Sequence, residues 1–309
     1  MKVKVSVVQD HPVFLDLEAS LDKVEKLVKI EAEKNVDLVL FPESFLPGYP
    51  RGFDFGTVVG KRSDQGKQLY HRYYENSFDL EGAEMKRLVK LSRECGVYLV
   101  MGVTEKNKVN GSLYCSSLYI SPSVGLMGVH RKIKPTGLER LIWAEADGAS
   151  LVSFDTKIGR MGGLICWENY MPLARTAMYQ DGVELYLAPT ADARTEWTAT
   201  MQHIALEGRC YVLGCNQYFK KAYYPEEFHP LVRLEEEEIC RGGSVIVGPD
   251  GKIIAGPLFG ENGVLRATLD LGEVIKGKLD FDPVGHYHRP DIFSLKVEKK
   301  PSIIQENSK

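Results

Sequence analysis

The sequence lacks the features that are typical of membrane proteins, secreted proteins and proteins stabilised by disulfides or zinc. No apolar run approaches the roughly 18 residues that a membrane-spanning helix needs, and the six cysteines form no Cys-x-x-Cys pair. The opening MKVKVSVVQD has no cationic segment followed by an apolar stretch, and no small-residue cleavage site. We therefore expect a cytoplasmic protein with reduced thiols, without a disulfide framework or a zinc site.

An excess of charge of either sign is also missing. Lys and Arg total 39 against 42 Asp and Glu, giving a net charge of −3, so no broad positive field would attract nucleic acid or an anionic membrane. The composition therefore predicts a small, near-neutral ligand as the partner. With 309 residues, 44% of them hydrophobic, and no evident linker, we expect a single domain over residues 1–292 and a polar tail over 293–309.

Apolar runs alternate with segments of helical period. The pattern predicts a strand at 3–9, a helix at 16–34 and a second strand at 36–43, and it predicts a β-hairpin in which 113–120 and 126–133 flank a turn. This alternation is typical of an α/β protein.

One motif occurs twice. The segment VDLVLFPES at 36–44 is echoed by VELYLAPTA at 183–191, and a helix and then an apolar strand follow each copy. We interpret the echo as two sheet-and-helix halves packed into one body. The alternative, that buried strands of α/β proteins end in similar runs by chance, stays open.

The first half carries an insertion between the predicted strand at 36–43 and the next apolar strand, at 96–102. It contains PGYPRGFDFG (47–56) and a polar, aromatic helix around 71–76, which suit a lid or a pocket wall. A second irregular stretch at 220–240 carries an acidic run. We interpret that run as a solvated loop, with a subunit contact as the alternative.

Cys166 has a setting that the other cysteines lack. It ends the apolar strand GRMGGLIC, and Pro172 shortly afterwards can occupy the first turn of a helix. Ligands bind at the carboxyl edge of such sheets, and a helix N-terminus can lower a thiol pKa from about 8.5 to roughly 3.5–7.5. Cys166 is therefore a candidate nucleophile, with a small core residue as the alternative.

Two further ionisable groups end apolar strands. Glu43 closes LVLFPE and Lys132 closes LMGVHRK, and the turn Pro-Thr-Gly after Lys132 brings Glu139 back towards it. A nucleophile, a base and an electrophile at one sheet edge suit a covalent hydrolase: the buried carboxylate takes the thiol proton and the ammonium stabilises charge on the substrate. The alternatives are a helix N-cap or a surface salt bridge for Glu43 and a solvated surface charge for Lys132.

Histidines offer two other interpretations. His130 lies two residues before Lys132, so a Cys–His pair of the thiol-protease kind is an alternative base arrangement. His286 and His288 could bind a metal, but no cluster of Cys, Asp or Glu ligands lies beside them in the sequence, so we predict a docked C-terminal turn and no metal site.

Five ordered segments, from FPESFLPGYPRGF through HRKIKPTGLERLIW, GLICWENYMPL and LAPTAD to DPVGHYHRPD, resemble the nitrilase branch of the carbon-nitrogen hydrolase superfamily. Cys-Trp-Glu at 166–168 and GHYHRPD favour that branch over amidases and carbamoylases, and PGYPRGFDFG is similar to plant and arylacetonitrile-type enzymes. The resemblance places a Glu–Lys–Cys triad on Glu43, Lys132 and Cys166, and a supporting glutamate on Glu139. Ser44 departs from the alanine of many relatives, a small change.

The resemblance implies a four-layer α-β-β-α sandwich and dimers that assemble further, often into spirals. It implies hydrolysis of a nitrile to a carboxylic acid and ammonia through a thioimidate and a thioester on Cys166, without a cofactor. The alternatives are an amidase or a nitrile or cyanide hydratase with the same triad, and a non-catalytic scaffold.

The substrate-binding residues are predicted from their positions in the chain. Tyr49 and Phe53 follow Glu43, Trp167 adjoins Cys166, and Thr190 and Trp197 follow the equivalent strand of the second half. Aromatic walls suit an apolar substituent on a nitrile. Packing between helices is the alternative for both tryptophans.

Overall fold

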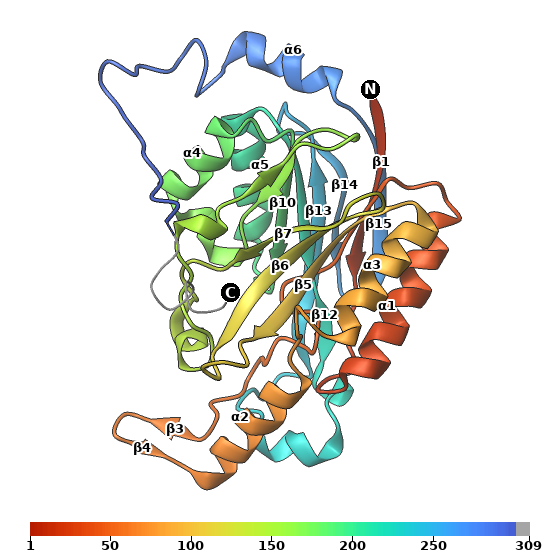
Figure 1. The fold of residues 1–309 in the computed structure, drawn as a ribbon, viewed down its shortest axis with the longest axis vertical. Helices are drawn as coiled ribbons and strands as arrows, with labels where there is room; N and C mark the ends of the chain where they lie inside the picture. Colours follow the sequence, from red (N-terminus) through yellow and green to blue (C-terminus); the bar gives the residue numbers. More distant parts are fainter. Residues whose placement is uncertain (301–309) are drawn as a thin grey trace.

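The computed structural model describes residues 1–300, and its centre is a pair of stacked β-sheets (Figure 1). The first sheet has the order β15-β1-β2-β5-β6-β7. Its strands are β1 (Lys2–Gln9), β2 (Leu38–Leu40), β5 (Tyr98–Lys106), β6 (Leu113–Ser121), β7 (Gly125–Arg131) and β15 (Gly263–Asp270). The second sheet has the order β12-β13-β11-β10-β9-β8, with β14 also paired to β13. Its strands are β8 (Ser153–Phe154), β9 (Met161–Gly163), β10 (Leu185–Thr190), β11 (Tyr211–Asn216), β12 (Tyr218–Lys220), β13 (Glu238–Val247) and β14 (Ile253–Phe259).

The alternation of side chains along each buried strand produces the layers. In β2, Leu38 and Leu40 face the core between the two sheets, whereas Val39 faces the helices outside. In β10, Leu187 faces the same inter-sheet core and Tyr186 faces outward. Because successive residues of a strand point to opposite faces, a strand that is apolar throughout can bury both of its faces.

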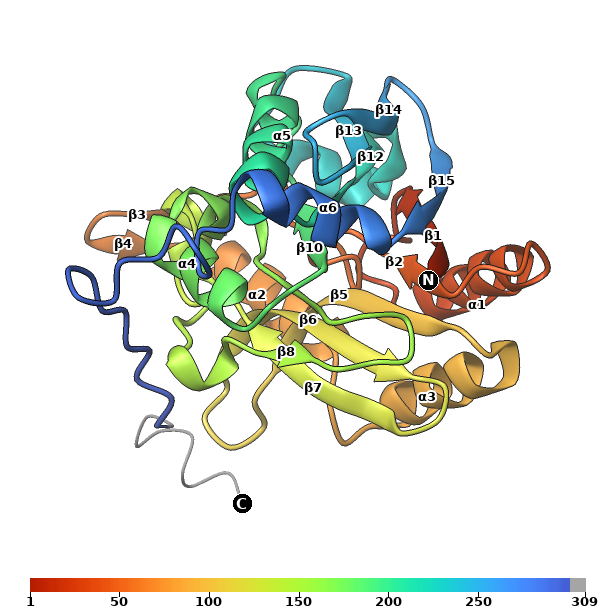
Figure 2. The ribbon, with the colours of Figure 1, turned by 90° about the horizontal axis from the view of Figure 1, so that it is seen from above.

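Helices cover the two outer faces (Figure 2). On the first sheet lie α1 (Leu17–Ala32) and α3 (Ala83–Cys95), and on the second lie α4 (Pro172–Gln180) and α5 (Glu196–Gly208). The side chain of Asp16 caps α1 by accepting a hydrogen bond from the Ala19 amide at 2.9 Å. The result is an α-β-β-α sandwich, as predicted.

The two copies of the repeated motif occupy equivalent places. β2 lies between the parallel strands β1 and β5, and β10 lies between the parallel strands β9 and β11. Glu43 and Thr190, which hold the same position in the two copies, therefore leave the centre of each sheet at its carboxyl edge.

The insertion of the first half extends from one end of the molecule (Figure 1). It includes the hairpin β3 (Thr57–Val58) and β4 (Lys61–Arg62), followed by α2 (Asp64–Asn76). At the other end lies α6 (Gly272–Asp280). The predicted hairpin is formed by β6 and β7. The stretch 220–240 was expected to be irregular, but its last residue, Cys240, lies in β13, where it pairs with β12.

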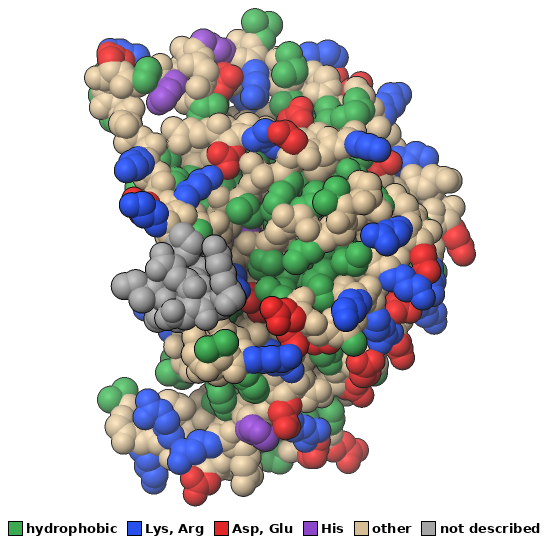
Figure 3. Space-filling view, viewed as in Figure 1, with side chains coloured by type: hydrophobic (Ala, Val, Ile, Leu, Met, Phe, Trp, Pro, Cys, Tyr) green, Lys and Arg blue, Asp and Glu red, His purple; other side chains and the backbone are tan. Residues whose placement is uncertain are grey.

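The predicted polar tail over 293–309 is described only to residue 300, and residues 301–309 lie outside the described part of the chain. Residues 293–300 form neither helix nor strand. On the face in Figure 3, basic and acidic side chains are interspersed, in keeping with the small net charge. In the described part of the chain, every helix is too short or too polar to cross a membrane.

Candidate active site

Chain segments that leave both sheets bring the predicted residues to one place. Glu43 follows β2, Lys132 directly follows β7, and Cys166 begins a 3-10 turn, Cys166–Tyr170, just after β9. Thr190 ends β10. Glycine permits the close packing beneath them, because a Cβ at Gly102 of β5 would overlap the Pro42 carbonyl oxygen.

Lys132 is the centre of the charged group. Its Nζ donates to Oε1 of Glu43 at 2.7 Å and to Oε2 of Glu139 at 2.7 Å. Glu139 returns to Lys132 on the 3-10 turn Gly137–Leu141, and the Thr136 amide donates to the same Oε2 at 2.6 Å. The turn predicted from Pro-Thr-Gly thus forms a capping arrangement that holds Glu139 in place.

The Glu43 carboxylate is fully buried, and only one of its two oxygens has hydrogen-bond partners. Oε1 accepts from Lys132 and, at 3.5 Å, from the Cys115 thiol. Oε2 has no hydrogen-bond partner among the described residues. Burial raises the pKa of Glu43 above its ordinary value, the Lys132 ammonium opposes the rise, and Glu139 adds to it. Glu43 thus has one oxygen free to take a proton and a raised affinity for it.

Lys132 keeps its charge in this setting. Burial alone would lower the pKa of Lys132, but the Glu43 carboxylate, with Glu139 beyond it, raises it well above the ordinary lysine value. Two carboxylates share one ammonium, so the cluster holds its protons strongly.

The Cys166 side chain is buried, and its backbone is strained at the start of the 3-10 turn. Cys166 has φ of 51°, a left-handed conformation that is uncommon for any residue other than glycine. The Asn169 side-chain amide donates to the Cys166 carbonyl oxygen at 2.8 Å, and the Thr190 hydroxyl donates to Sγ at 3.1 Å. The turn thus directs the sulfur towards the end of β10.

The expectation of a thiol with a lowered pKa is wrong. Burial raises the pKa of Cys166, the Glu43 carboxylate raises it further, and Lys132 and the Thr190 hydroxyl only partly offset the rise. The 3-10 turn that starts at Cys166 precedes α4, so the sulfur is not on the first turn of that helix. The free protein therefore holds a protonated thiol that needs a base.

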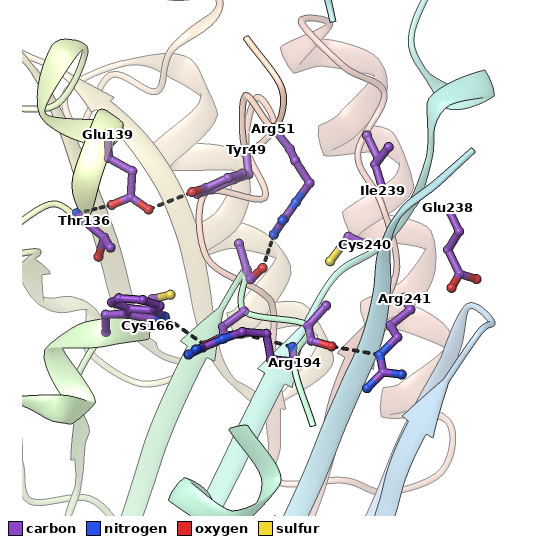
Figure 4. A pocket seen from close by; sticks show the side chains of 14 residues that line it. Tyr49, Arg51, Thr136, Glu139, Cys166, Arg194, Glu238, Ile239, Cys240 and Arg241 are labelled. Atoms are coloured by element: carbon purple, nitrogen blue, oxygen red, sulfur yellow. Dashed lines mark hydrogen bonds and ion pairs between the residues drawn. The ribbon is translucent and has the colours of Figure 1, made fainter. Parts of the chain in front are cut away.

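Cys166 opens on a pocket of about 460 Å³ (Figure 4). The Tyr49 hydroxyl donates to Oε1 of Glu139 at 2.7 Å, and burial together with the Glu139 charge raises the pKa of Tyr49, which keeps this proton in place. The Trp167 indole lies at the pocket and donates to Oδ2 of Asp192 at 2.8 Å. Tyr49, Trp167 and Cys166 therefore line the same pocket.

A second cavity of about 380 Å³ adjoins the first and shares Tyr49, Arg51, Thr136 and Glu139 with it. Phe53 lines this second cavity rather than the pocket at Cys166, and it stacks on Phe14 with 5.3 Å between ring centres. The wall is mainly apolar; its apolar residues include Phe53, Phe55, Leu138, Leu141, Ile142 and Leu234.

Trp197 was predicted at the substrate pocket, and this expectation is wrong. It is 1% exposed and belongs to the core between α5, α4 and the second sheet. Trp197 lies on the buried side of α5, with Met201 and Ile204, so its indole packs against the second sheet rather than towards Cys166. Trp197 thus follows the alternative of packing between helices, whereas Trp167, 41% exposed, does not.

Several charged residues at the pocket went unnoticed in the sequence. Arg51 donates to the Ala191 carbonyl oxygen, and the Asp192 carboxylate joins Trp167 to Arg194. Arg51 lies inside the segment PGYPRGFDFG that was predicted as a pocket wall. Glu238, within the stretch 220–240, and Arg241, just after it, line the pocket from β13.

The histidine alternatives do not fit the geometry. His130 forms hydrogen bonds with Glu168 and with the Ser150 carbonyl oxygen, not with Cys166. His286 and His288 follow α6 near the chain's C-terminal segment. Within residues 1–300, no three His, Cys, Asp or Glu side chains are grouped to hold a metal ion.

Comparisons with known proteins define the class. Residues 4–278 match the carbon-nitrogen hydrolase family. The chain is 46% identical to Nitrilase 3 of Arabidopsis thaliana over 305 residues, which cover 97% of this chain and 88% of the relative. It is 45% identical to the bifunctional nitrilase/nitrile hydratase NIT4A of Lupinus angustifolius, covering 97% of this chain and 87% of the relative.

A solved structure shares the fold. The carbon-nitrogen hydrolase from Helicobacter pylori G27 superposes with a TM-score of 0.73 at 17% identity, over 94% of this chain and 97% of the other. The α-β-β-α sandwich and its site thus define a carbon-nitrogen hydrolase. The chain belongs to this family and, within it, to the nitrilase branch.

Proposed function

We propose that this chain is a nitrilase, which hydrolyses an organic nitrile to the carboxylic acid and ammonia. The observation that carries the proposal is the Lys132 ammonium held between Glu43 and Glu139, with Glu139 and the Cys166 thiol at the wall of one pocket. Two curated relatives of similar length and about 45% identity are named for this activity.

In the first step Cys166 adds to the nitrile carbon. The thiol proton passes to the free Oε2 of Glu43 while the sulfur–carbon bond forms and one carbon–nitrogen π bond breaks. Lys132 gives a proton to the nitrogen and regains one from Glu43 across their 2.7 Å hydrogen bond. The product is a neutral thioimidate, with every charge of the cluster restored.

In the second step water replaces the nitrogen. Glu43 takes a proton from water as the water oxygen bonds to the thioimidate carbon, and this proton passes to the nitrogen, which gives a tetrahedral intermediate with a hydroxyl and an amino group. The hydroxyl proton then passes to the amino nitrogen as the carbon–nitrogen bond breaks, so ammonia leaves and the carbonyl of a thioester forms. A second water, activated in the same way, releases the carboxylic acid and returns the thiol. The role of Lys132 is to stabilise the charge that develops on the substrate nitrogen and oxygen.

Glu139 and Tyr49 support the lysine. Glu139 accepts from Lys132 and from Tyr49 through different oxygens, at 2.7 Å in each case. These contacts hold the ammonium in one position while its other partner, Glu43, changes protonation. We assign Glu139 a positioning role in this reaction.

The shape of the cavities favours a nitrile with an apolar substituent. The pocket at Cys166 has room for the reacting group, and the apolar second cavity continues from it past Tyr49. Tyr49, Phe53 and Trp167 are the aromatic walls that we propose for the substituent, with Thr190 beside the sulfur. Trp197 is excluded from this set by its place in the core.

The amide is a second candidate product. The tetrahedral intermediate can expel the sulfur instead of ammonia, and one relative is named a bifunctional nitrilase/nitrile hydratase. The same residues would then act as a nitrile hydratase. The two outcomes differ only in which bond to the reacting carbon breaks.

We propose that the chain forms homo-oligomers, through its acidic segment 220–240 and its C-terminal segment. The basis is the resemblance to nitrilases, and light scattering after size exclusion tests it: a stable monomer would remove the proposal. We also propose a cytoplasmic location, which six unpaired cysteines support.

A panel of aliphatic, arylaliphatic and aromatic nitriles, assayed for ammonia, acid and amide, tests the function. The proposal predicts ammonia and acid in equal amounts from at least one class. Amide without acid would favour the hydratase, and turnover of amides but not nitriles would favour an amidase. No turnover of any nitrile or amide, with Cys166 alkylated no faster than Cys115, would favour a scaffold.

A further inference from the structure

The Cys-Trp-Glu segment contains a buried carboxylate that the proposed mechanism does not use. Glu168 is 1% exposed, two residues after Cys166 and within the same 3-10 turn. An ionised side chain in such a position is costly unless each of its oxygens is satisfied. The partners of Glu168 therefore indicate what it does.

Glu168 holds two different chain segments through their backbone amides. Oε1 accepts from the Ile133 amide at 2.7 Å, and Oε2 accepts from the Ile165 amide at 2.7 Å. Ile133 directly follows Lys132 and Ile165 directly precedes Cys166. One carboxylate thus joins the residue next to the ammonium to the residue next to the sulfur.

His130 completes the arrangement. Its Nε2 lies 2.9 Å from Oε2 of Glu168, and its Nδ1 donates to the Ser150 carbonyl oxygen at 2.8 Å. Burial alone would lower the pKa of His130, but the Glu168 carboxylate raises it. The imidazolium therefore balances the charge of Glu168, and it comes from β7, the strand that delivers Lys132.

We propose that Glu168 is a positioning residue of the proposed nitrile hydrolysis, which with His130 fixes the end of β7 at Lys132 to the turn at Cys166. The relative placement of ammonium and sulfur matters because a misplacement of about 1 Å can lower a rate by roughly 100-fold. The left-handed conformation of Cys166 makes a fixed turn necessary, since strained residues persist only where their surroundings hold them.

The variant Glu168→Gln tests the proposal. Glutamine keeps the shape of the glutamate side chain, but its amide nitrogen must face one of the two backbone N–H groups. Because both groups are donors, one of the two hydrogen bonds is lost and that chain segment is no longer held. We expect kcat for a nitrile to fall on the order of 10- to 100-fold, with KM within about threefold. Alkylation of Cys166 by iodoacetamide changes as well, because the turn that presents the sulfur moves.

Glu168→Asp separates geometry from charge. The shorter side chain keeps the negative charge but cannot reach both amides, so it should lose as much kcat as Glu168→Gln. Full activity in a folded Glu168→Asp would overturn the proposal. So would a kcat within about twofold of the parent in folded Glu168→Gln, because the rate sensitivity to placement would then be absent.

Glu31→Gln is the matched control. Glu31 is also a buried carboxylate, 1% exposed, and it bonds to Arg266, Lys34 and Ser6 at the α1 side of the first sheet. Its loss should lower the thermal midpoint and leave kcat and Cys166 alkylation unchanged. If Glu31→Gln lowers kcat as much as Glu168→Gln, the effect is general destabilisation and the proposal fails.

His130→Gln covers the case in which the Glu168 variants do not fold. It leaves both backbone contacts of Glu168 and removes the imidazolium, so kcat should fall about 3- to 10-fold at constant KM, less than for full misplacement. An unchanged kcat in that variant would overturn the proposal. Failure of the parent protein to turn over any nitrile refutes the proposed function instead, and the alkylation rates still report on the Cys166 turn.

Discussion

Glu43→Gln should separate the reactivity of the thiol from catalysis. The substitution removes the free oxygen that takes the thiol proton, so the rate of nitrile turnover falls. It also removes a negative charge that raises the pKa of Cys166, while the positive charge of Lys132 remains. The pKa of the Cys166 thiol should therefore fall in the variant, and the thiolate fraction at neutral pH should rise.

The two effects have opposite signs and different sizes. Loss of a general base costs about 10²- to 10⁴-fold in rate, which is roughly 2.7–5.4 kcal/mol of transition-state stabilisation. Thiolate content rises about tenfold for each unit by which a thiol pKa falls towards the ambient pH. We thus expect kcat/KM to drop at least about 100-fold while alkylation of Cys166 becomes faster.

The assay pairs ammonia release with peptide-resolved iodoacetamide labelling at pH 7. Cys95, which ends α3 and is partly exposed, is the internal comparison in the same digest. If Glu43→Gln slows alkylation in step with turnover, Glu43 does not act on the sulfur as described. Turnover within about tenfold of the parent would show that another group is the base.

Three further results are expected. Thr190→Val removes the hydroxyl that donates to Sγ at 3.1 Å, and the loss of this hydrogen bond raises the pKa of Cys166. We expect kcat/KM to fall about tenfold, which corresponds to the free energy of one hydrogen bond. An unchanged kcat/KM would contradict this prediction. Burial opposes the shift, but hydrogen bonds from an arginine, a lysine and a serine lower the pKa of Glu31 from 4.5 to about 2. The free energy of unfolding should therefore decrease as the pH falls from about 4.5 through about 2. Glu31→Gln should cost about 2 kcal/mol of stability at pH 7 and should reduce this pH dependence in urea titrations. Trp197→Ala should cost about 3–5 kcal/mol with KM unchanged, whereas Trp167→Ala should change KM and cost less than about 1 kcal/mol; calorimetry and kinetics giving the reverse pattern would contradict these two placements.

The sequence predicts the fold and the charged cluster because both follow from strand ends. Apolar runs locate β2 and β7 in the first sheet and β9 in the second, and the ionisable residues that follow them are Glu43, Lys132 and Cys166. The stacking of the two sheets brings these strand ends together at the carboxyl edge. In the repeated motif, Thr190 holds the position of the second copy that corresponds to Glu43. Local patterns suffice here because the topology supplies the long-range contacts.

Tertiary packing decides the features that were not predicted. The pKa of Cys166 depends on its burial and on Glu43, which is distant in the sequence, so the pKa shift predicted from the adjacent helix has the wrong sign. Trp197 was assigned by its distance from a strand end, whereas the face of α5 decides where its ring lies. Arg51 lies in a loop and Glu238 begins β13, so neither belongs to a pattern of apolar residues that would have marked it in the sequence. Their place at the pocket follows only from the folded structure.

The proposed hydrolysis requires a covalent bond between Cys166 and the substrate carbon. Mixing the protein with a nitrile, quenching within the first turnover and mapping the added mass measures this bond directly. We predict substrate-derived mass on the peptide that contains Cys166, and neither added mass nor ammonia from Cys166→Ala. Ammonia release by Cys166→Ala, or an adduct on Cys115 or Cys240 in place of Cys166, would contradict the account.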